Sequence, residues 1–291
     1  MSAPTSSAGI GAAVDALPPL RDALSDHGLN ADKRFGQHFL LDLNITDKSA
    51  RLAGPLEGRC VIEVGPGPGG LTRALLKAGA ERVIAVEKDA RFLPLLSELA
   101  DAADGRLVVV EADALKVDEA ALAAEHAPGL PVRVVSNLPY NVGTPLLVKW
   151  LTAAFTPEAM ALMFQKEVAL RITAEAGADD YGRLAVLCQA LARCEPLMNL
   201  PARAFTPPPK VESAVVGLTP FTGADRPPAP LIAALERVTA AAFGQRRKML
   251  RSSLKTLGGE ALCAAADLPA DVRAETVDNA GFLRLAKVVA G

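Results

Sequence analysis

The sequence predicts an α/β protein, with a mostly parallel sheet covered by helices and a small all-α domain behind it. Short apolar, β-branched runs alternate with helical stretches over the first half of the chain, which is typical of a parallel sheet buried on both faces. After residue 230 the strand signals fade and helical periodicity dominates. A chain of 291 residues, 50% of them hydrophobic and 22% charged, is long enough for one such domain and a smaller second one.

Each element has a local reason in the sequence. Residues 17–29 predict a short amphipathic helix, and a second helix over 44–53 stops at Gly54 and Pro55, residue types that end helices. Aliphatic and β-branched runs predict strands over residues 60–64, 82–86, 107–110, 132–135 and 159–164. Helices are predicted over residues 70–78, 89–100, 117–125, 143–154, 165–174 and 181–192. Residues 211–218 predict one further strand, antiparallel and at the edge of the sheet.

Composition divides the chain into four parts. Residues 1–20 are rich in Ala and Ser and predict a flexible tail. Residues 21–221 hold the predicted sheet and its helices. Residues 222–230 contain Gly, Asp and three prolines, which is typical of a linker. Residues 231–291 form the predicted C-terminal helical domain.

Composition also bounds the environment of the protein. No apolar run is long enough to cross a bilayer, and the N-terminal residues lack the basic and apolar regions of a secretory signal. The four cysteines show no Cys-x-x-Cys spacing, so we expect neither a metal site nor a disulfide. Free thiols suit the reducing cytoplasm. The chain has no surplus apolar stripe, so we expect a monomer.

A glycine-rich loop follows the first strand of the predicted sheet and opens a helix. It reads Glu63-Val-Gly-Pro-Gly-Pro-Gly-Gly70, and Gly65 and Gly67 let the backbone approach a ligand closely. The next strand ends at Glu87, about twenty residues later, where a carboxylate can accept hydrogen bonds from ribose hydroxyls. Asp113 follows the third strand and can accept from an adenine amine. Either carboxylate alone could simply cap a helix, but ligands bind at the carboxyl ends of such strands.

The same loop indicates which cofactor fits. A dinucleotide is normally held by Gly-x-Gly-x-x-Gly, whose helix N-terminus contacts the pyrophosphate. Here the glycines occupy every second position, and Pro66 and Pro68 have no N–H group to offer a phosphate. S-adenosylmethionine carries no phosphate and loses nothing by this. The loop therefore favours S-adenosylmethionine over NAD.

The tetrapeptide Asn137-Leu-Pro-Tyr140 follows the fourth strand of the predicted sheet. The N6 amine of adenine is a poor nucleophile because its lone pair is delocalised into the ring. The Asn137 side-chain oxygen and the carbonyl of Leu138 or Pro139 can accept hydrogen bonds from the two N–H groups of this amine. Such hydrogen bonds favour a tetrahedral nitrogen. Pro139 stiffens the loop, and Tyr140 offers a ring on which an extruded base can stack. The alternative is an ordinary turn with a packed tyrosine; beside the glycine-rich loop, the tetrapeptide predicts methyl transfer to a base nitrogen.

A basic stretch near the C-terminus predicts contact with phosphates. The net charge of the chain is −2, but no acidic residue occurs from residue 237 to residue 259. Most charged runs are solvated helix faces, whereas a run without any acid favours a phosphate-facing patch. Its basic residues include Arg246, Arg247, Lys248, Arg251 and Lys255.

Six segments of the chain resemble one family, the KsgA/RsmA family of small-subunit ribosomal RNA adenine dimethyltransferases. They are residues 33–42, 63–70, 137–140, 181–184, 205–213 and 243–250. No segment departs from the family pattern, and the resemblance covers roughly residues 20 to 290. The resemblance implies a Rossmann-like, class I S-adenosylmethionine-dependent methyltransferase sheet with a small all-α C-terminal domain.

The resemblance also implies roles for single residues. It places the cofactor site at His38, Leu40, Gly65, Glu87, Asp113 and Asn137. Without the resemblance, His38 reads as a packed loop histidine. The resemblance places Phe205 on the target base opposite Tyr140; the alternative is that Phe205 anchors a proline-rich turn. The five basic residues would then grip RNA backbone.

The implied reaction is N6,N6-dimethylation of two adjacent adenosines in a hairpin loop near the 3′ end of 16S rRNA. The implied substrate is the immature small ribosomal subunit, and the reaction consumes four S-adenosylmethionine molecules. Unpaired loop bases are the ones that proteins can reach.

Other functions stay open from the sequence. A large-subunit rRNA adenine methyltransferase is a close alternative, although residues 205–213 and 243–250 favour the small-subunit family. A DNA adenine methyltransferase typically has Asp where this chain has Asn137. A non-catalytic ribosome-assembly or transcription factor could use the same fold, but the intact tetrapeptide and glycine-rich loop favour an enzyme.

Overall fold

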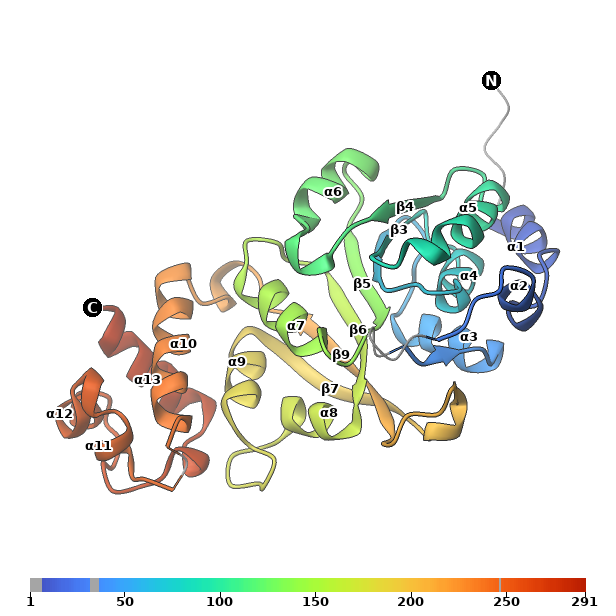
Figure 1. Ribbon diagram of the computed structural model, residues 1–291. Coiled ribbons are helices and arrows are strands. Elements are labelled where there is room, and N and C mark those ends of the chain that lie inside the picture. The colour runs from blue at the N-terminus through green and yellow to red at the C-terminus, as the bar shows by residue number, and fades with distance from the viewer. Residues whose placement is uncertain (1–6, 32–36, 246) are drawn as a thin grey trace. The chain divides into compact units, whose positions relative to one another are not determined.

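The protein consists of two compact units. Figure 1 shows the computed structural model, which describes residues 7–31, 37–245 and 247–291. The first unit contains the described residues up to Leu147, together with Pro157–Lys166 and Pro196–Leu218. The second unit contains Val148–Thr156, Glu167–Glu195 and Thr219–Gly291.

The helices and strands have the following bounds. The strands are β1 (Phe39–Leu40), β2 (Cys60–Val64), β3 (Arg82–Glu87), β4 (Leu107–Glu111), β5 (Val132–Asn137), β6 (Ala159–Gln165), β7 (Ala192–Leu200), β8 (Phe205–Thr206) and β9 (Ser213–Pro220). The helices up to β7 are α1 (Ser7–Asp15), α2 (Leu20–Asp26), α3 (Leu43–Leu52), α4 (Gly70–Lys77), α5 (Leu93–Ala102), α6 (Glu119–His126), α7 (Gly143–Thr152), α8 (Lys166–Thr173) and α9 (Arg183–Leu191). The later helices are α10 (Ala229–Phe243), α11 (Leu250–Ser253), α12 (Gly259–Ala265) and α13 (Asn279–Ala290).

The main sheet has the order β4-β3-β2-β5-β6-β9-β7. The strands from β4 to β6 pair in parallel, and β9 pairs with β6 in the antiparallel direction. The mostly parallel sheet predicted from the sequence is confirmed. The chain builds outward from β2 to β4 on one side and then returns to place β5 on the other side of β2. Such a reversal opens a crevice at the carboxyl ends of the strands.

The central strands are buried, as their apolar sequences predict. All five residues of β2 are buried, and so are five of the six residues of β3. Figure 1 shows α1 to α5 grouped on one side of these strands and α6 on the other. Helices on both faces leave only the strand ends accessible to a ligand.

The prediction of one edge strand over residues 211–218 was partly wrong. β9 is antiparallel, as predicted, but β7 lies beyond it at the edge of the sheet. β7 was not predicted because Arg193, Glu195 and Pro196 interrupt its apolar residues, and the helical pattern of α9 runs directly into it. Its middle residues are half-buried or exposed, so an edge strand here needs no continuous apolar run.

The prediction that residues 1–20 form a flexible tail was wrong for the described part of that segment. Residues 7–15 form α1, whose side chains at Ile10 and Val14 are each only 1% exposed. These two residues are four positions apart and therefore lie on one helix face. Asp15 also forms an ion pair with Lys77 of α4, with Oδ1 and Nζ 2.8 Å apart. Two buried side chains among Ala and Ser give too weak a pattern to recognise, and residues 1–6 lie outside the described part of the chain.

The second unit is helical and has its own core. The Phe243 ring stacks on Phe282 with centroids 5.4 Å apart, and the buried Tyr181 hydroxyl donates to the Val277 carbonyl at 2.9 Å. This core differs in extent from the predicted C-terminal domain of residues 231–291, because α9 packs against α10 and α13. The predicted linker 222–230 also overlaps the start of α10 at Ala229. Within the described residues, no helix is both long and apolar enough to cross a membrane.

Candidate active site

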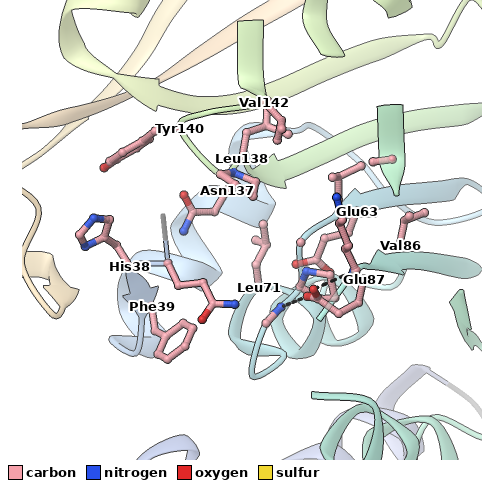
Figure 2. A pocket seen from close by; sticks show the side chains of 18 of the residues that line it. His38, Phe39, Glu63, Leu71, Val86, Glu87, Asn137, Leu138, Tyr140 and Val142 are labelled. Atoms are coloured by element: carbon pink, nitrogen blue, oxygen red, sulfur yellow. Dashed lines mark hydrogen bonds between the residues drawn. The ribbon is translucent and has the colours of Figure 1, made fainter. Parts of the chain in front are cut away.

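A cavity lies at the carboxyl ends of β2 to β5, at the reversal of the strand order. Figure 2 shows Glu63 and Glu87 on one side of it and His38, Asn137 and Tyr140 on the other. The predicted site residues that line this cavity are His38, Leu40, Gly65, Gly67, Glu87, Asp113, Asn137, Leu138, Pro139 and Tyr140. Four strand ends and the segment before β1 thus bring together residues that are far apart in the sequence.

The glycine-rich loop wraps one end of the cavity with left-handed backbone. Gly65 and Gly67 have φ values of +68° and +53°, a region that other L-residues rarely adopt. Gly65 also lies close to Pro139, because a Cβ built on it would be 3.2 Å from the proline Cγ. The loop and the tetrapeptide therefore pack directly on each other, and glycine is required for both the conformation and the contact.

No backbone N–H group of residues 65–69 points freely into the cavity. Gly65 donates to the Val86 carbonyl and Gly69 to the Pro66 carbonyl, each at 2.9 Å. The Gly67 N–H donates to Glu87 Oε2 at 3.0 Å. The remaining two residues of the loop are prolines, which have no N–H. Residues 65–69 therefore offer a phosphate no free N–H group, in agreement with the prediction from the two prolines.

Glu87 is held at the end of β3 by three backbone donors and is 6% exposed. Besides Gly67, the N–H groups of Lys88 and Asp89 both donate to its Oε1 at 2.8 Å. Burial raises the pKa of the Glu87 carboxyl, and these three hydrogen bonds oppose the rise. A carboxylate has about four lone-pair positions. Oε2 therefore keeps an acceptor position for a ligand hydroxyl.

Asp113 caps a short helical turn and also faces the cavity. Its Oδ1 accepts from the Leu115 N–H at 3.1 Å, and its Oδ2 accepts from Lys88 Nζ at 2.9 Å. The hydrogen bond from Lys88 is the main reason that the pKa of Asp113 is lowered. The capping interpretation and the ligand interpretation of Asp113 are therefore compatible with each other.

The turn after β5 leaves two acceptors unused. The Pro139 carbonyl accepts from both Val142 N–H and Gly143 N–H, each at 3.1 Å. The Asn137 side chain and the Leu138 carbonyl have no hydrogen-bond partner among the described residues. The sequence left Leu138 and Pro139 as alternatives for the second acceptor; the turn occupies Pro139 and so favours Leu138.

Tyr140 and His38 form an aromatic wall. Their ring centroids are 5.6 Å apart with an angle of 33° between the planes. Burial raises the pKa of Tyr140, whose hydroxyl lies 2.7 Å from Ser213 Oγ. His38 Nδ1 lies 2.7 Å from the Pro207 carbonyl oxygen, which can only accept, so Nδ1 carries the hydrogen. His38 is therefore not simply a packed loop histidine, because its ring also lines the cavity.

Phe205 does not line this cavity, in contrast to its predicted place opposite Tyr140. Its side chain is 2% exposed and belongs to the hydrophobic core of the first unit. β8 pairs with β1 in the antiparallel direction, with Phe205 opposite Leu40. The structure thus supports the alternative that Phe205 anchors the turn before the prolines.

Glu63 is a cavity residue to which the sequence analysis gave no role. Its carboxyl is 2% exposed, and the Thr72 hydroxyl donates to its Oε2 at 2.7 Å. Burial raises its pKa to about 8, and the nearby Glu87 adds to the rise. The signal in the sequence was an acid inside an otherwise apolar strand, which is rare without a function or a partner.

The predicted RNA-binding residues lie in the second unit. Arg247, Lys248, Arg251 and Lys255 are all exposed, between the end of α10 and the turn after α11. Arg246 lies outside the described residues. The accessible side chains are consistent with a phosphate-facing role.

The fold and the site define a Rossmann-like methyltransferase. Residues 28–290 match the family model described as ribosomal RNA adenine dimethylase, and the chain therefore belongs to the ribosomal RNA adenine dimethylase family. It is 66% identical over 273 residues to the ribosomal RNA small subunit methyltransferase A of Phenylobacterium zucineum (strain HLK1), covering 94% of this chain and 93% of the relative.

Two crystal structures have a similar fold. A dimethyladenosine transferase from Plasmodium falciparum superimposes with a TM-score of 0.69 at 24% identity, over 85% of this chain and 96% of that one. The 23S rRNA methyltransferase ErmE superimposes with a TM-score of 0.65 at 27% identity, over 87% of this chain and all of that one. Membership of the family makes the chain a ribosomal RNA methyltransferase.

Proposed function

We propose that this protein transfers methyl groups from S-adenosylmethionine to the N6 amines of two adjacent adenosines in the 3′-terminal hairpin loop of 16S rRNA. The family match and the small-subunit relative support the reaction class and the RNA. One observation supports the chemistry: the Asn137 side chain and the Leu138 carbonyl lie beside the Tyr140 ring and accept no hydrogen bond from the part of the chain that the structure describes.

The cavity fits S-adenosylmethionine by its charge and by its lack of phosphate donors. Glu63, Glu87 and Asp113 place three carboxyl groups around it, which suits a cationic ligand. The N–H groups of residues 65–69 are either absent or already bonded. When bound, this cofactor supplies an electrophilic methyl group on a sulfonium. Glu87 Oε2 is placed to accept from a ribose hydroxyl and Asp113 from the adenine amine.

The chain's own residues then make the target amine a nucleophile. The Asn137 side-chain oxygen and the Leu138 carbonyl accept hydrogen bonds from the two N–H groups of the amine. Because these hydrogen bonds favour a tetrahedral nitrogen, its lone pair is less conjugated with the ring. Tyr140 supports the extruded base by stacking. The methylated amine is cationic and loses its proton to water, so no general base is needed. Positioning and fixed dipoles supply the catalysis.

The second unit is proposed to hold the RNA. Arg247, Lys248, Arg251 and Lys255, with Arg246, form a basic stretch without acids, which suits phosphate contacts rather than base recognition. We propose that the C-terminal region is the RNA-binding domain. As the sequence predicts, the protein would act as a monomer and without a metal. Its substrate would be the immature small subunit in the cytoplasm.

Primer extension on ribosomal RNA tests this proposal directly. RNA is compared from cells that lack the protein, cells that regain it, and cells that regain the Asn137→Ala variant. We expect dimethylation stops at two adjacent adenosines near the 3′ end of 16S rRNA only with the active protein. Stops on 23S rRNA would instead identify a large-subunit enzyme. Normal subunit maturation without any methylation would identify a non-catalytic assembly factor.

A further inference from the structure

Two buried carboxyl groups line the same cavity without a cationic partner. Glu63 of β2 and Glu87 of β3 are 2% and 6% exposed. Neither forms an ion pair with a Lys, Arg or His of the described residues. Figure 2 shows both side chains on the same side of the cavity. The charge of Glu87 raises the pKa of Glu63. Two negative charges that repel each other in a poorly solvated place are unfavourable, so one of the two carboxyls holds a proton.

The hydrogen bonds decide which carboxyl that is. Glu87 accepts three backbone N–H bonds, which stabilise its ionised form. Glu63 accepts one hydroxyl, from Thr72 of α4. The other charged groups that line the cavity, Lys88 and Asp113, form an ion pair with each other at 2.9 Å. Glu63 is therefore the neutral acid, in agreement with its pKa of about 8.

We propose that Glu63 loses its proton when the cationic cofactor binds and regains it when the neutral thioether product takes the cofactor's place. This rests on the proposed function, because it requires S-adenosylmethionine as the ligand. A positive charge in the cavity favours the carboxylate of Glu63, which then holds the sulfonium or ammonium group electrostatically. On binding, the proton passes from the Glu63 carboxyl to water.

The proton balance closes over one methyl transfer. The sulfonium charge moves with the methyl group to the target amine, which loses a proton to water. The cavity is then left with an excess of negative charge, and Glu63 takes one proton back from water. The product S-adenosylhomocysteine therefore faces a neutral Glu63. Glu63 acts as a positioning residue that distinguishes the cofactor from its product by charge.

Isothermal titration calorimetry measures the number of protons that the protein releases when each ligand binds. The intact protein is titrated at pH 7 with S-adenosylmethionine and with S-adenosylhomocysteine, in two buffers of different ionisation enthalpy. With a pKa of about 8, Glu63 is about nine-tenths protonated at this pH. S-adenosylmethionine should therefore release about 0.9 proton more than S-adenosylhomocysteine. The two ligands share the same amino and carboxyl groups, so the contributions of those groups cancel.

Two variants locate the effect. Glu63→Gln keeps an acceptor for Thr72 but cannot titrate, so the difference in proton release should vanish. Glu119→Gln is the matched control, because Glu119 is also buried but does not line the cavity. It should keep the full difference. A difference that survives in Glu63→Gln would overturn the assignment to Glu63.

The wild-type protein alone also tests the inference. The ratio of affinities for S-adenosylmethionine and S-adenosylhomocysteine should rise about tenfold from pH 6 to pH 7 and level off above pH 8. Binding of both ligands with a ratio independent of pH would overturn the proton switch and leave the proposed function standing. Failure of the wild-type protein to bind S-adenosylmethionine at all would overturn the proposed function itself.

Discussion

The carbonyl oxygens of Leu138 and Pro139 are one peptide unit apart and have different roles. Pro139 closes the turn by accepting from Val142 and Gly143, and this holds the loop in shape. The Leu138 carbonyl has no such bond among the described residues, and we propose that it acts with the Asn137 side chain on a ligand. The sequence identifies both carbonyls as candidates; only the hydrogen bonds of the folded turn separate them.

Asn137→Ala should lower the methylation rate about 100- to 1,000-fold, because it removes one of two preorganised groups that act on the reacting amine. The measurement is single-turnover methylation of immature small subunits, with the melting temperature of the variant as a control for folding. Full activity of a well-folded variant would contradict the proposed role of Asn137.

Tyr140→Ala should reduce the methylation rate about 10- to 100-fold, because stacking contributes about 1–3 kcal/mol per base. Tyr140→Phe keeps the ring and loses only the hydrogen bond to Ser213, so most of the activity should remain. Calorimetry should show nearly unchanged cofactor binding for both variants. Equal losses in the two variants would place the function in the hydroxyl instead.

Glu63→Gln should stabilise the protein, and increasingly so as the pH rises from about 5 to 8. The pKa of Glu63 is about 8 in the folded protein and 4.5 when the group is free. Between these values the unfolded chain has released a proton that the folded protein retains, so wild-type stability falls as the pH rises. Thermal denaturation at pH 5, 6.5 and 8 measures the gap. A constant difference in melting temperature would contradict the shifted pKa.

The two-residue strands β1 and β8 pair with each other and so connect distant parts of the first unit. Leu40 pairs with Phe205, and His38 beside it contacts the Pro207 carbonyl. Both contacts place the segment before β1 at the cavity. The Phe205 ring lies in the hydrophobic core of the first unit and does not line the cavity, so its predicted stacking on the base stays a prediction to be tested.

Phe205→Ala should lower the free energy of unfolding by about 3–5 kcal/mol, as expected for a buried aromatic ring. Phe205→Leu should cost less than about 1.5 kcal/mol and keep methylation within a few-fold of wild type. Chemical denaturation and the methylation assay on the same samples separate the two effects. A stable Phe205→Leu protein as inactive as Tyr140→Ala would show that the ring stacks on the base after all.

The sequence predicted those elements whose signal is local. The strands β2 to β6 were predicted almost to the residue, because each is a continuous run of mostly aliphatic residues, and in β2 and β3 this run is buried almost throughout. α1 was missed because Ile10 and Val14 are the only buried side chains among its residues of described burial, 9–15, and β7 because an edge strand tolerates charges. In the site, strand-end positions were predictable from topology. The neutral state of Glu63 was not, since it depends on how deeply the folded chain buries the carboxyl and on the nearby Glu87 from another strand.

The two units divide the proposed work between chemistry and RNA binding. The cavity belongs to the first unit, and the acid-free basic stretch belongs to the second. The net charge of −2 does not indicate this stretch, because acidic residues elsewhere in the chain outweigh its positive charge. Binding to RNA depends on how charge is distributed along the chain and not on its sum.

Replacing Arg247 and Lys248 with Ala should weaken binding to immature subunits and make it less dependent on salt. Each lost phosphate contact lowers the slope of log affinity against log salt by about 1. Exposed Arg51 and Lys287, changed to Ala together, serve as the matched control and should leave the slope unchanged. Filter binding across a salt series gives both slopes. Identical slopes for the two double variants would show that the basic stretch is only a solvated helix face.

The N–H groups of residues 65–69 in the glycine-rich loop are bonded or absent, and this affects which cellular compounds can compete with S-adenosylmethionine for the cavity. ATP and NAD share the adenosine part of S-adenosylmethionine and are abundant. They differ from it by phosphates, which at residues 65–69 meet two prolines and bonded N–H groups, with three carboxyl groups elsewhere in the cavity lining. We therefore expect the loop to disfavour these common adenosine compounds. Adenosine-based inhibitors of this protein should accordingly carry cationic and not anionic tails.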